Sequence, residues 1–162
     1  MTKCPVTALT VRNNFKNARL LIVEDNADHR FVIQHALRQS MPEVKAILVA
    51  TEAEALAYLT GCGTNDWEIP KMILLDLYLP DRQTGWRVLA SIRALPAIVG
   101  RIPVVLFSHS NHHDDITEAY QRGCASYLVK PTLTSDWQRY FDLLRSYWWE
   151  TVTLPVNRFS VF

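Results

Sequence analysis

The feature that most constrains the fold is a regular alternation of short apolar segments with longer amphipathic ones. The short segments are rich in Val, Ile and Leu, and the middle three are nearly continuous in apolar character, as in strands covered on both faces. The five predicted strands are RLLIVE (19–24), KAILVA (45–50), MILLD (72–76), PVVLFS (103–108) and SYLVK (126–130). Strands that alternate with helices predict an α/β fold, a doubly wound parallel sheet with right-handed crossovers.

Five helices are predicted between and after these strands, and several have recognisable ends. The second opens with a Thr-x-x-Glu capping box, Thr51 with Glu54, and stops at Gly61. The fourth is expected to begin with Asn111 as its cap and to end before Gly123. The five segments are NADHRFVIQHALRQS, TEAEALAYLTG, TGWRVLASIRAL, NHHDDITEAYQRG and LTSDWQRYFDLLRSYWWE.

The last predicted helix carries an unusual number of aromatic residues. Trp137, Phe141, Leu144 and Trp148 recur at helical spacing, so we expect this stripe to face the core. The remaining large aromatics, such as Tyr147, cannot all share that face. Some of them are therefore expected to be exposed, as on a surface that binds a partner.

The composition suits one globular domain and excludes several classes of function. The chain has 162 residues, of which 49% are apolar and 20% charged. A net charge of +1 gives no electrostatic reason to bind nucleic acid or an anionic membrane, and no apolar run approaches the ~20 residues of a spanning helix. The scattered Cys4, Cys62 and Cys124 fit reduced thiols better than a disulfide framework, which predicts a cytoplasmic protein.

Polar side chains stand at the carboxyl ends of four predicted strands, which meet at one edge of an open parallel sheet. The first strand ends in Glu24 and Asp25, the third in Asp76, the fourth in Ser108 and the fifth in Lys130. Crowded carboxylates raise one another's pKa unless a cation lies among them, and their hard oxygens suit Mg²⁺. A carboxylate can also accept a phosphoryl group, whose charge a metal and an ammonium neutralise. These residue types predict a site for phosphoryl transfer.

The motifs LLIVEDN, ILLDLYLP, VVLFSHS and SYLVKP, in this order over roughly residues 19 to 148, resemble the receiver domain of two-component response regulators. The resemblance implies a flavodoxin-like sheet of order 2-1-3-4-5. It also implies a signalling protein rather than an enzyme, since such a protein catalyses only its own phosphorylation and dephosphorylation. The implied roles are phospho-acceptor for Asp76, phosphoryl contact for Lys130, Mg²⁺ binding for Glu24, Asp25, Asp76 and the backbone carbonyl of Tyr78, and switching for Ser108 and Tyr127. In the family the peptide bond between Lys130 and Pro131 is usually cis.

The segment DLLRSYWWETVTLP (142–155) resembles the small receivers that partner cyanobacterial phytochrome kinases and carry no output domain. This resemblance implies that the partner is a sensor histidine kinase of the phytochrome type, and that the protein forms a homodimer through its last strands and helices. The signal would leave through the dimer, an output protein or onward transfer to a phosphotransfer histidine. The implied organisation is an N-terminal arm (1–18), a receiver domain (19–150) and a C-terminal tail (151–162).

Two other functions stay open. An aspartate-nucleophile phosphatase needs a second carboxylate two residues after the nucleophile, where this chain has Tyr78. A pseudo-receiver that binds partners without phosphorylation is kept open by Tyr78 and His109, which replace smaller residues of the family. Tyr78 would shield the acyl phosphate and slow its hydrolysis, and His109 would hinder access to Asp76 or restrict the movement of Tyr127.

The histidine-rich segment after the fourth strand has two interpretations. His109, His112 and His113, with Asp114 and Asp115, could bind a transition metal. Because no ligand spacing recurs elsewhere, we interpret the segment as a solvated loop and the first turn of a helix.

Overall fold

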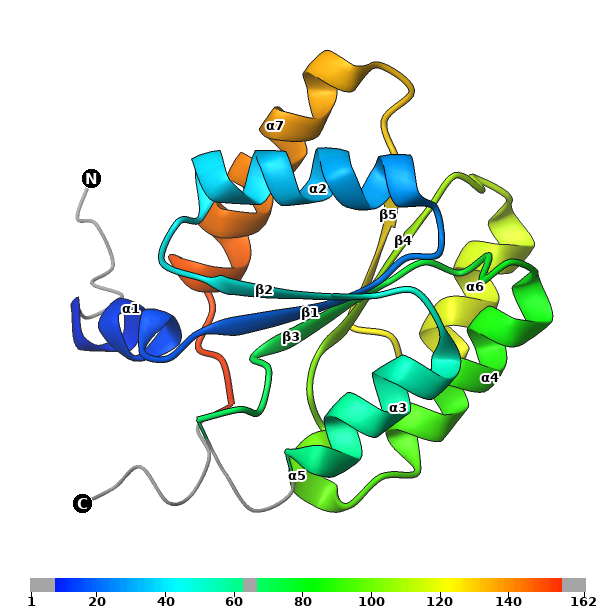
Figure 1. Ribbon diagram of the computed structural model, residues 1–162, viewed down its shortest axis with the longest axis horizontal. Coiled ribbons are helices and arrows are strands. Elements are labelled where there is room, and N and C mark those ends of the chain that lie inside the picture. Colours follow the sequence, from blue (N-terminus) through cyan, green and yellow to red (C-terminus); the bar gives the residue numbers. More distant parts are fainter. Residues whose placement is uncertain (1–7, 63–66, 156–162) are drawn as a thin grey trace.

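The computed structural model describes residues 8–62 and 67–155, which form one parallel sheet with helices on both faces (Figure 1). The strands are β1 (Arg19–Val23), β2 (Lys45–Val49), β3 (Met72–Leu75), β4 (Val104–Ser108) and β5 (Ser126–Val129). Their order in the sheet is β2-β1-β3-β4-β5, and every neighbouring pair is parallel. The five predicted strands and the implied flavodoxin-like order are confirmed.

The described part of the chain has seven α-helices, so the predicted number of five was wrong. The helices are α1 (Ala8–Phe15), α2 (Ala27–Ser40), α3 (Glu52–Gly61), α4 (Arg82–Arg93), α5 (Ala97–Gly100), α6 (His113–Gln121) and α7 (Thr134–Leu144). Neither α1 nor α5 was predicted, because eight and four residues are too few to establish a helical period. Among the described residues, no helix is both long and apolar enough to cross a bilayer.

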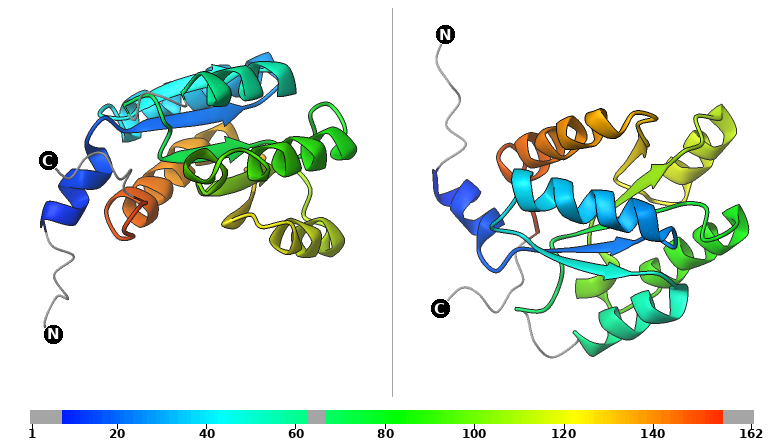
Figure 2. Two further views of the ribbon diagram at one scale, coloured as in Figure 1. Left: turned by 90° about the horizontal axis from the view of Figure 1, so that it is seen from below. Right: turned by 45° about the horizontal axis from the view of Figure 1, so that its top comes forward.

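Helices cover both faces of the sheet (Figure 2), and an apolar layer lies between the sheet and the helices on each side. Side chains alternate along β1, so Leu21 and Val23 join the layer under α3, α4 and α6, whereas Leu20 and Ile22 join the layer under α2 and α7. The prediction that the middle three strands are covered on both faces was wrong for β2, which lies at an edge and is only partly buried. β1 takes that central place instead, because position along the chain does not give position in the sheet.

The C-terminal stripe is buried as predicted through Leu144, and Trp148 packs half-buried against the same core. After α7 the chain continues as a π-helical segment, η1 (Arg145–Trp149). The hydrogen bonds of a π-helix span five residues rather than four. Trp149, five residues after Leu144, is therefore the fully buried side chain of this segment. The side chain of Asn14 on α1 holds this end of the chain, donating to the carbonyls of Trp149 and Val152 at 2.9 and 2.6 Å.

The helix ends that frame the strand edge are fixed by local contacts. Thr51 caps α3 as predicted, and its Oγ1 accepts from the Glu54 N–H at 3.2 Å. The predicted cap Asn111 was wrong, because α6 starts later and its cap residue is His112. At the start of α4, a Cβ on Gly85 would lie 1.7 Å from the Leu77 carbonyl oxygen, so this close approach requires glycine.

Candidate phosphorylation site

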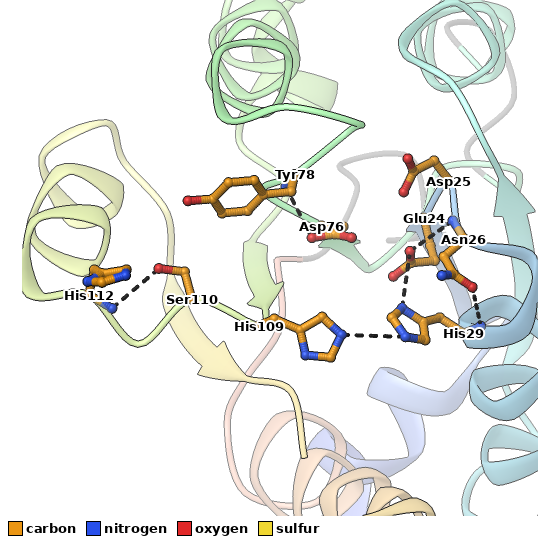
Figure 3. A pocket seen from close by; sticks show the side chains of 9 residues that line it. All are labelled: Glu24, Asp25, Asn26, His29, Asp76, Tyr78, His109, Ser110 and His112. Atoms are coloured by element: carbon orange, nitrogen blue, oxygen red, sulfur yellow. Dashed lines mark hydrogen bonds and ion pairs between the residues drawn. The ribbon is translucent and has the colours of Figure 1, made fainter. Parts of the chain in front are cut away.

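Three carboxylates meet at the carboxyl edge of the sheet (Figure 3). The parallel register pairs Val23 of β1 with Leu75 of β3, so the residues that follow these strands are neighbours. Glu24, Asp25 and Asp76 each offer an oxygen, and the three atoms lie within 4.8 Å of one another. Glu24 and Asp76 are 1% and 7% exposed, whereas Asp25 faces solvent. The expected cluster is therefore present, with one open side.

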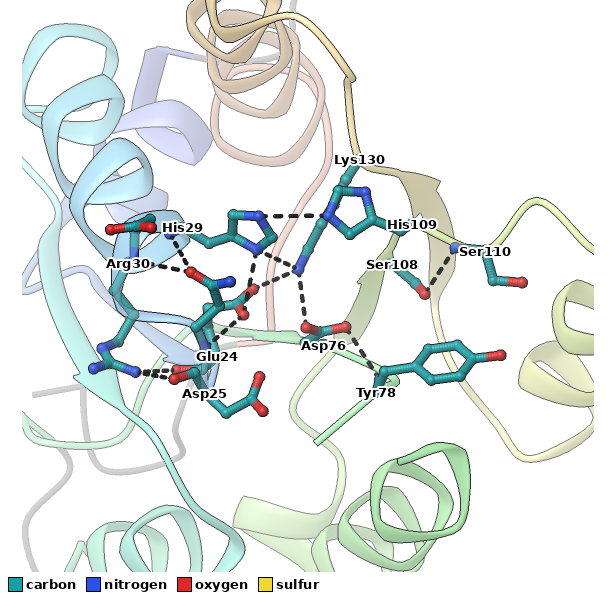
Figure 4. A network of polar contacts seen from close by, with 12 residues as sticks. Glu24, Asp25, His29, Arg30, Asp76, Tyr78, Ser108, His109, Ser110 and Lys130 are labelled. Carbon is teal, nitrogen blue, oxygen red and sulfur yellow. Dashed lines mark hydrogen bonds and ion pairs between the residues drawn. The ribbon is translucent and has the colours of Figure 1, made fainter. Parts of the chain in front are cut away.

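Lys130 enters this cluster from the end of β5 (Figure 4). Its Nζ donates to Glu24 Oε2 at 2.5 Å and to Asp76 Oδ2 at 2.9 Å, and the residue is 3% exposed. Burial raises the pKa of Asp76 to about 6, while the charge of Lys130 opposes that rise and Glu24 adds to it. One ammonium leaves the three carboxylates undercompensated, so the cluster attracts a cation.

The chemistry of the cluster fits a hard divalent metal. Its donors are carboxylate oxygens, and Asp25 keeps one side open to water, as Mg²⁺ requires. The backbone of Tyr78 also reaches the site, where its N–H donates to Asp76 Oδ1 at 3.1 Å. The metal role of the Tyr78 carbonyl stays a prediction. Among the described residues, this is the single group of three acidic, His or Cys side chains placed to share an ion.

The carboxylates line an open pocket of about 430 Å³. The ring of Tyr78 extends from Asp76 toward Ser110 and forms one wall (Figure 3). The lining residues are Glu24, Asp25, Asn26, His29, Asp76, Tyr78, His109, Ser110 and His112. Asp76 lines this open pocket, so neither Tyr78 nor His109 closes it off.

The predicted switch residues lie on the far side of the pocket. Ser108 is fully buried at the end of β4, and its Oγ accepts from the Ser110 N–H at 3.2 Å. Tyr127 on β5 is half-buried, and its hydroxyl donates to the Ser110 carbonyl at 2.8 Å. Ser110 thus connects both predicted switch residues.

Asp115 in the first turn of α6 ties these loops together. This carboxylate is 1% exposed and accepts from Arg82 Nη1 at 2.7 Å, Ser110 Oγ at 2.5 Å and the Tyr78 hydroxyl at 3.1 Å. Burial alone would raise the pKa of Asp115, but the hydroxyls of Ser110 and Tyr78 and the charge of Arg82 outweigh it and lower that pKa. The Asp115 carboxylate therefore connects α6 to the segment between β3 and α4 and to the loop between β4 and α6.

The comparisons with known proteins agree with this geometry. Residues 20–140 match the model of the response regulator receiver domain. The chain belongs to the response regulator receiver family. Response regulator Rcp1 of Synechocystis sp. is 34% identical over 137 residues, which cover 84% of this chain and 92% of Rcp1.

Two solved structures of such receivers superpose on this one. The Mn²⁺-bound form of response regulator Rcp1 has 33% identity and a TM-score of 0.72. The phosphorylated cyanobacterial phytochrome response regulator RcpA has 34% identity and a TM-score of 0.75. Each match covers 86% of this chain and 99% of the other. The receiver is thus homologous to phytochrome response regulators, and neither the phosphatase nor the pseudo-receiver is favoured.

In one detail this receiver departs from the expected pattern. The single cis peptide bond of the described residues joins Leu79 to Pro80, so the expectation of a cis bond between Lys130 and Pro131 was wrong. Lys130 nevertheless reaches the carboxylates.

Sequence reasoning missed two residues of the site. His29 lies in the first turn of α2, four residues after Asp25, and its Nδ1 is 3.3 Å from Lys130 Nζ. Asp115 shares the buried face of α6 with Ala119, four residues later. That helical spacing is the one signal in the sequence that could have marked Asp115 as an inward-facing carboxylate.

Proposed function

We propose that Asp76 accepts a phosphoryl group from a sensor histidine kinase in a reaction that depends on Mg²⁺. The observation that carries this proposal is the buried carboxylate of Asp76, which lines an open pocket beside two other carboxylates and one ammonium. An Asp76 oxygen forms the new P–O bond as the P–N bond to the kinase histidine breaks, which gives an acyl phosphate.

Each neighbour has a role in this transfer. Glu24, Asp25, Asp76 and the Tyr78 carbonyl would hold the Mg²⁺. When bound, the metal supplies charge neutralisation for the phosphoryl oxygens. Lys130 contacts the phosphoryl group, and Ser108 donates its hydroxyl to an arriving oxygen, with Tyr127 as the switch aromatic. Catalysis is limited to the protein's own phosphorylation and dephosphorylation. The free thiols Cys62 and Cys124 suit a cytoplasmic protein.

Intact mass spectrometry after incubation with acetyl phosphate and Mg²⁺ tests the acceptor. We expect wild type to gain one phosphoryl group, a chelator to prevent that gain, and Asp76→Asn to gain none. The matched control is Asp28→Asn, which removes an exposed carboxylate on α2 and should be phosphorylated as wild type is. An unmodified wild type, or a modified Asp76→Asn, would contradict the proposal.

The phosphodonor that we propose is a phytochrome-type histidine kinase. The support is the likeness to RcpA, which is a cyanobacterial phytochrome response regulator, at 34% identity over 86% of this chain. The test is transfer from an autophosphorylated phytochrome kinase, in competition with an unrelated histidine kinase. Faster transfer from the unrelated kinase would exclude this pathway and leave Asp76 as the acceptor.

We further propose that the output surface is a homodimer interface on β5 and α7. An apolar hollow of about 810 Å³ lies there, beside Leu143 and Tyr147, which are 58% and 55% exposed. Asp136 and Arg139 also line it, so a two-fold axis can pair the acid of one copy with the base of the other.

Light scattering on Tyr147→Ser, beside the exposed Phe31→Ser on α2 as control, tests this interface. We expect Tyr147→Ser alone to weaken the dimer. A wild type that is monomeric with and without phosphorylation would instead assign the hollow to an output or phosphotransfer protein.

A further inference from the structure

The ammonium of Lys130 has a third partner that the receiver signature does not include. Its three protons can make three hydrogen bonds, and three acceptors surround it. They are Glu24 Oε2 at 2.5 Å, Asp76 Oδ2 at 2.9 Å and His29 Nδ1 at 3.3 Å (Figure 4). All three donor positions of a buried cation are therefore in use.

These contacts fix the tautomer of His29. Lysine can only donate, so His29 Nδ1 must be the acceptor and carries no proton. In that tautomer the proton of the neutral ring lies on Nε2, which is 3.4 Å from Nε2 of His109 and is placed to donate to it. The competing arrangement, in which a proton on Nδ1 is donated to Glu24 Oε1, has a longer distance of 3.5 Å.

The ring of His29 is held from several sides. The Asn26 side chain caps α2 and accepts from the His29 N–H at 3.1 Å, which fixes the backbone of the first turn. The ring centroid lies 5.0 Å from that of His109 and 5.6 Å from that of Trp137. Because these neighbours fix the ring, its Nδ1 can restrict the position of the Lys130 ammonium.

We propose that His29 is a positioning residue for phosphoryl transfer, which keeps the Lys130 ammonium in place while Asp76 reacts. One N–H of Lys130 turns from Asp76 Oδ2 to an arriving phosphoryl oxygen, and Glu24 and His29 retain the other two. His109, directly after Ser108, holds His29 in the tautomer that accepts. The inference rests on the proposed function of Asp76 and Lys130.

Three variants test the role in the initial rate of phosphorylation by acetyl phosphate at fixed pH and saturating Mg²⁺. We expect His29→Leu, which has no acceptor, to lower the maximal rate about tenfold. His29→Asn places a carbonyl oxygen near the position of Nδ1 and should recover most of that loss. The control is His35→Leu on the exposed side of α2, which should match wild type.

A second background separates positioning from folding. In Lys130→Met, His29→Leu should cause no further loss, because the group that His29 positions is absent. An unchanged rate in His29→Leu or no recovery in His29→Asn would overturn the proposal. So would a loss caused by His29→Leu in the Lys130→Met background that equals its loss in wild type.

Long-range ¹H–¹⁵N NMR of the histidine rings gives a readout that needs no phosphorylation. We expect His29 to carry its proton on Nε2, and a proton on Nδ1 would refute the contact. If wild type is not phosphorylated at all, the proposed function fails, while the NMR result still decides whether His29 accepts from Lys130.

Discussion

The two halves of the proposed phosphorylation site differ in how their buried carboxylates are compensated. The metal half consists of Glu24, Asp25, Asp76 and Lys130, and the switch half of Tyr78, Arg82, Ser108, Ser110, Asp115 and Tyr127. In the metal half, the carboxylates of Glu24 and Asp76 share one ammonium, and the exposed carboxylate of Asp25 lies beside them. In the switch half, one carboxylate receives a guanidinium and two hydroxyls. The first half is short of positive charge, and the second is saturated.

The difference indicates that the stability of the metal half depends on a bound ligand and that the stability of the switch half does not. A buried charge costs free energy unless partners compensate it, so the metal half is destabilised until a cation binds there. Asp115 already has its partners, so the switch half holds one arrangement firmly. Removal of a carboxylate should therefore have opposite effects on the free energy of unfolding in the two halves.

The largest effect is expected in the switch half. Asp115→Ala leaves Arg82 and two hydroxyls without their acceptor and should lower the free energy of unfolding by about 2 kcal/mol. Urea denaturation measures it, with the exposed Asp114→Ala as the matched control. An equal effect of the two substitutions would show that the Asp115 contacts do not stabilise the fold.

The metal half should respond more to its ligand. Mg²⁺ at ten times its dissociation constant should stabilise wild type by about 1.4 kcal/mol. Asp25→Asn should reduce this gain, because it removes a ligand charge but no buried contact, whereas Asp28→Asn should retain it. Thermal unfolding with and without Mg²⁺ measures the gain, and one that survives Asp25→Asn would place the ion elsewhere.

The smallest expected effect is that of Asp76→Asn, which should raise the free energy of unfolding, whereas Asp115→Ala should lower it. Burial raises the pKa of Asp76 in the folded state from 3.8 to about 6, so the folded protein holds its proton more tightly than the unfolded chain does. In chelator, wild type should therefore lose stability as the pH rises from 4 through 6. This shift corresponds to about 3 kcal/mol at pH 8. Asp76→Asn should gain only about 1 kcal/mol of it over wild type, because the substitution also removes the ion pair with Lys130.

The measurement is the difference in unfolding midpoint between Asp76→Asn and wild type across this pH range. It should shrink as the pH falls toward 4. A difference that does not depend on pH would mean that the carboxylate of Asp76 is fully compensated by Lys130, and the contrast between the halves would disappear.

The sequence by itself determined the five strands and the residues of the metal half. Each of those residues directly follows a strand, and parallel strands bring their carboxyl ends to one edge whatever the helices do. A local pattern of apolar segments that end in Glu24, Asp76 or Lys130 was therefore sufficient to predict the meeting of these side chains.

Only the tertiary structure decided the contacts made by residues on helices and loops. Asp115 reaches Ser110 and Tyr78 because of how α6 is rotated against β4 and the loop after β3, and His29 reaches Lys130 across 101 residues of chain. The burial of Trp149 instead of Trp148 follows from one π-helical turn. Such contacts depend on helix rotation and loop path, which non-local packing sets and which no local pattern encodes.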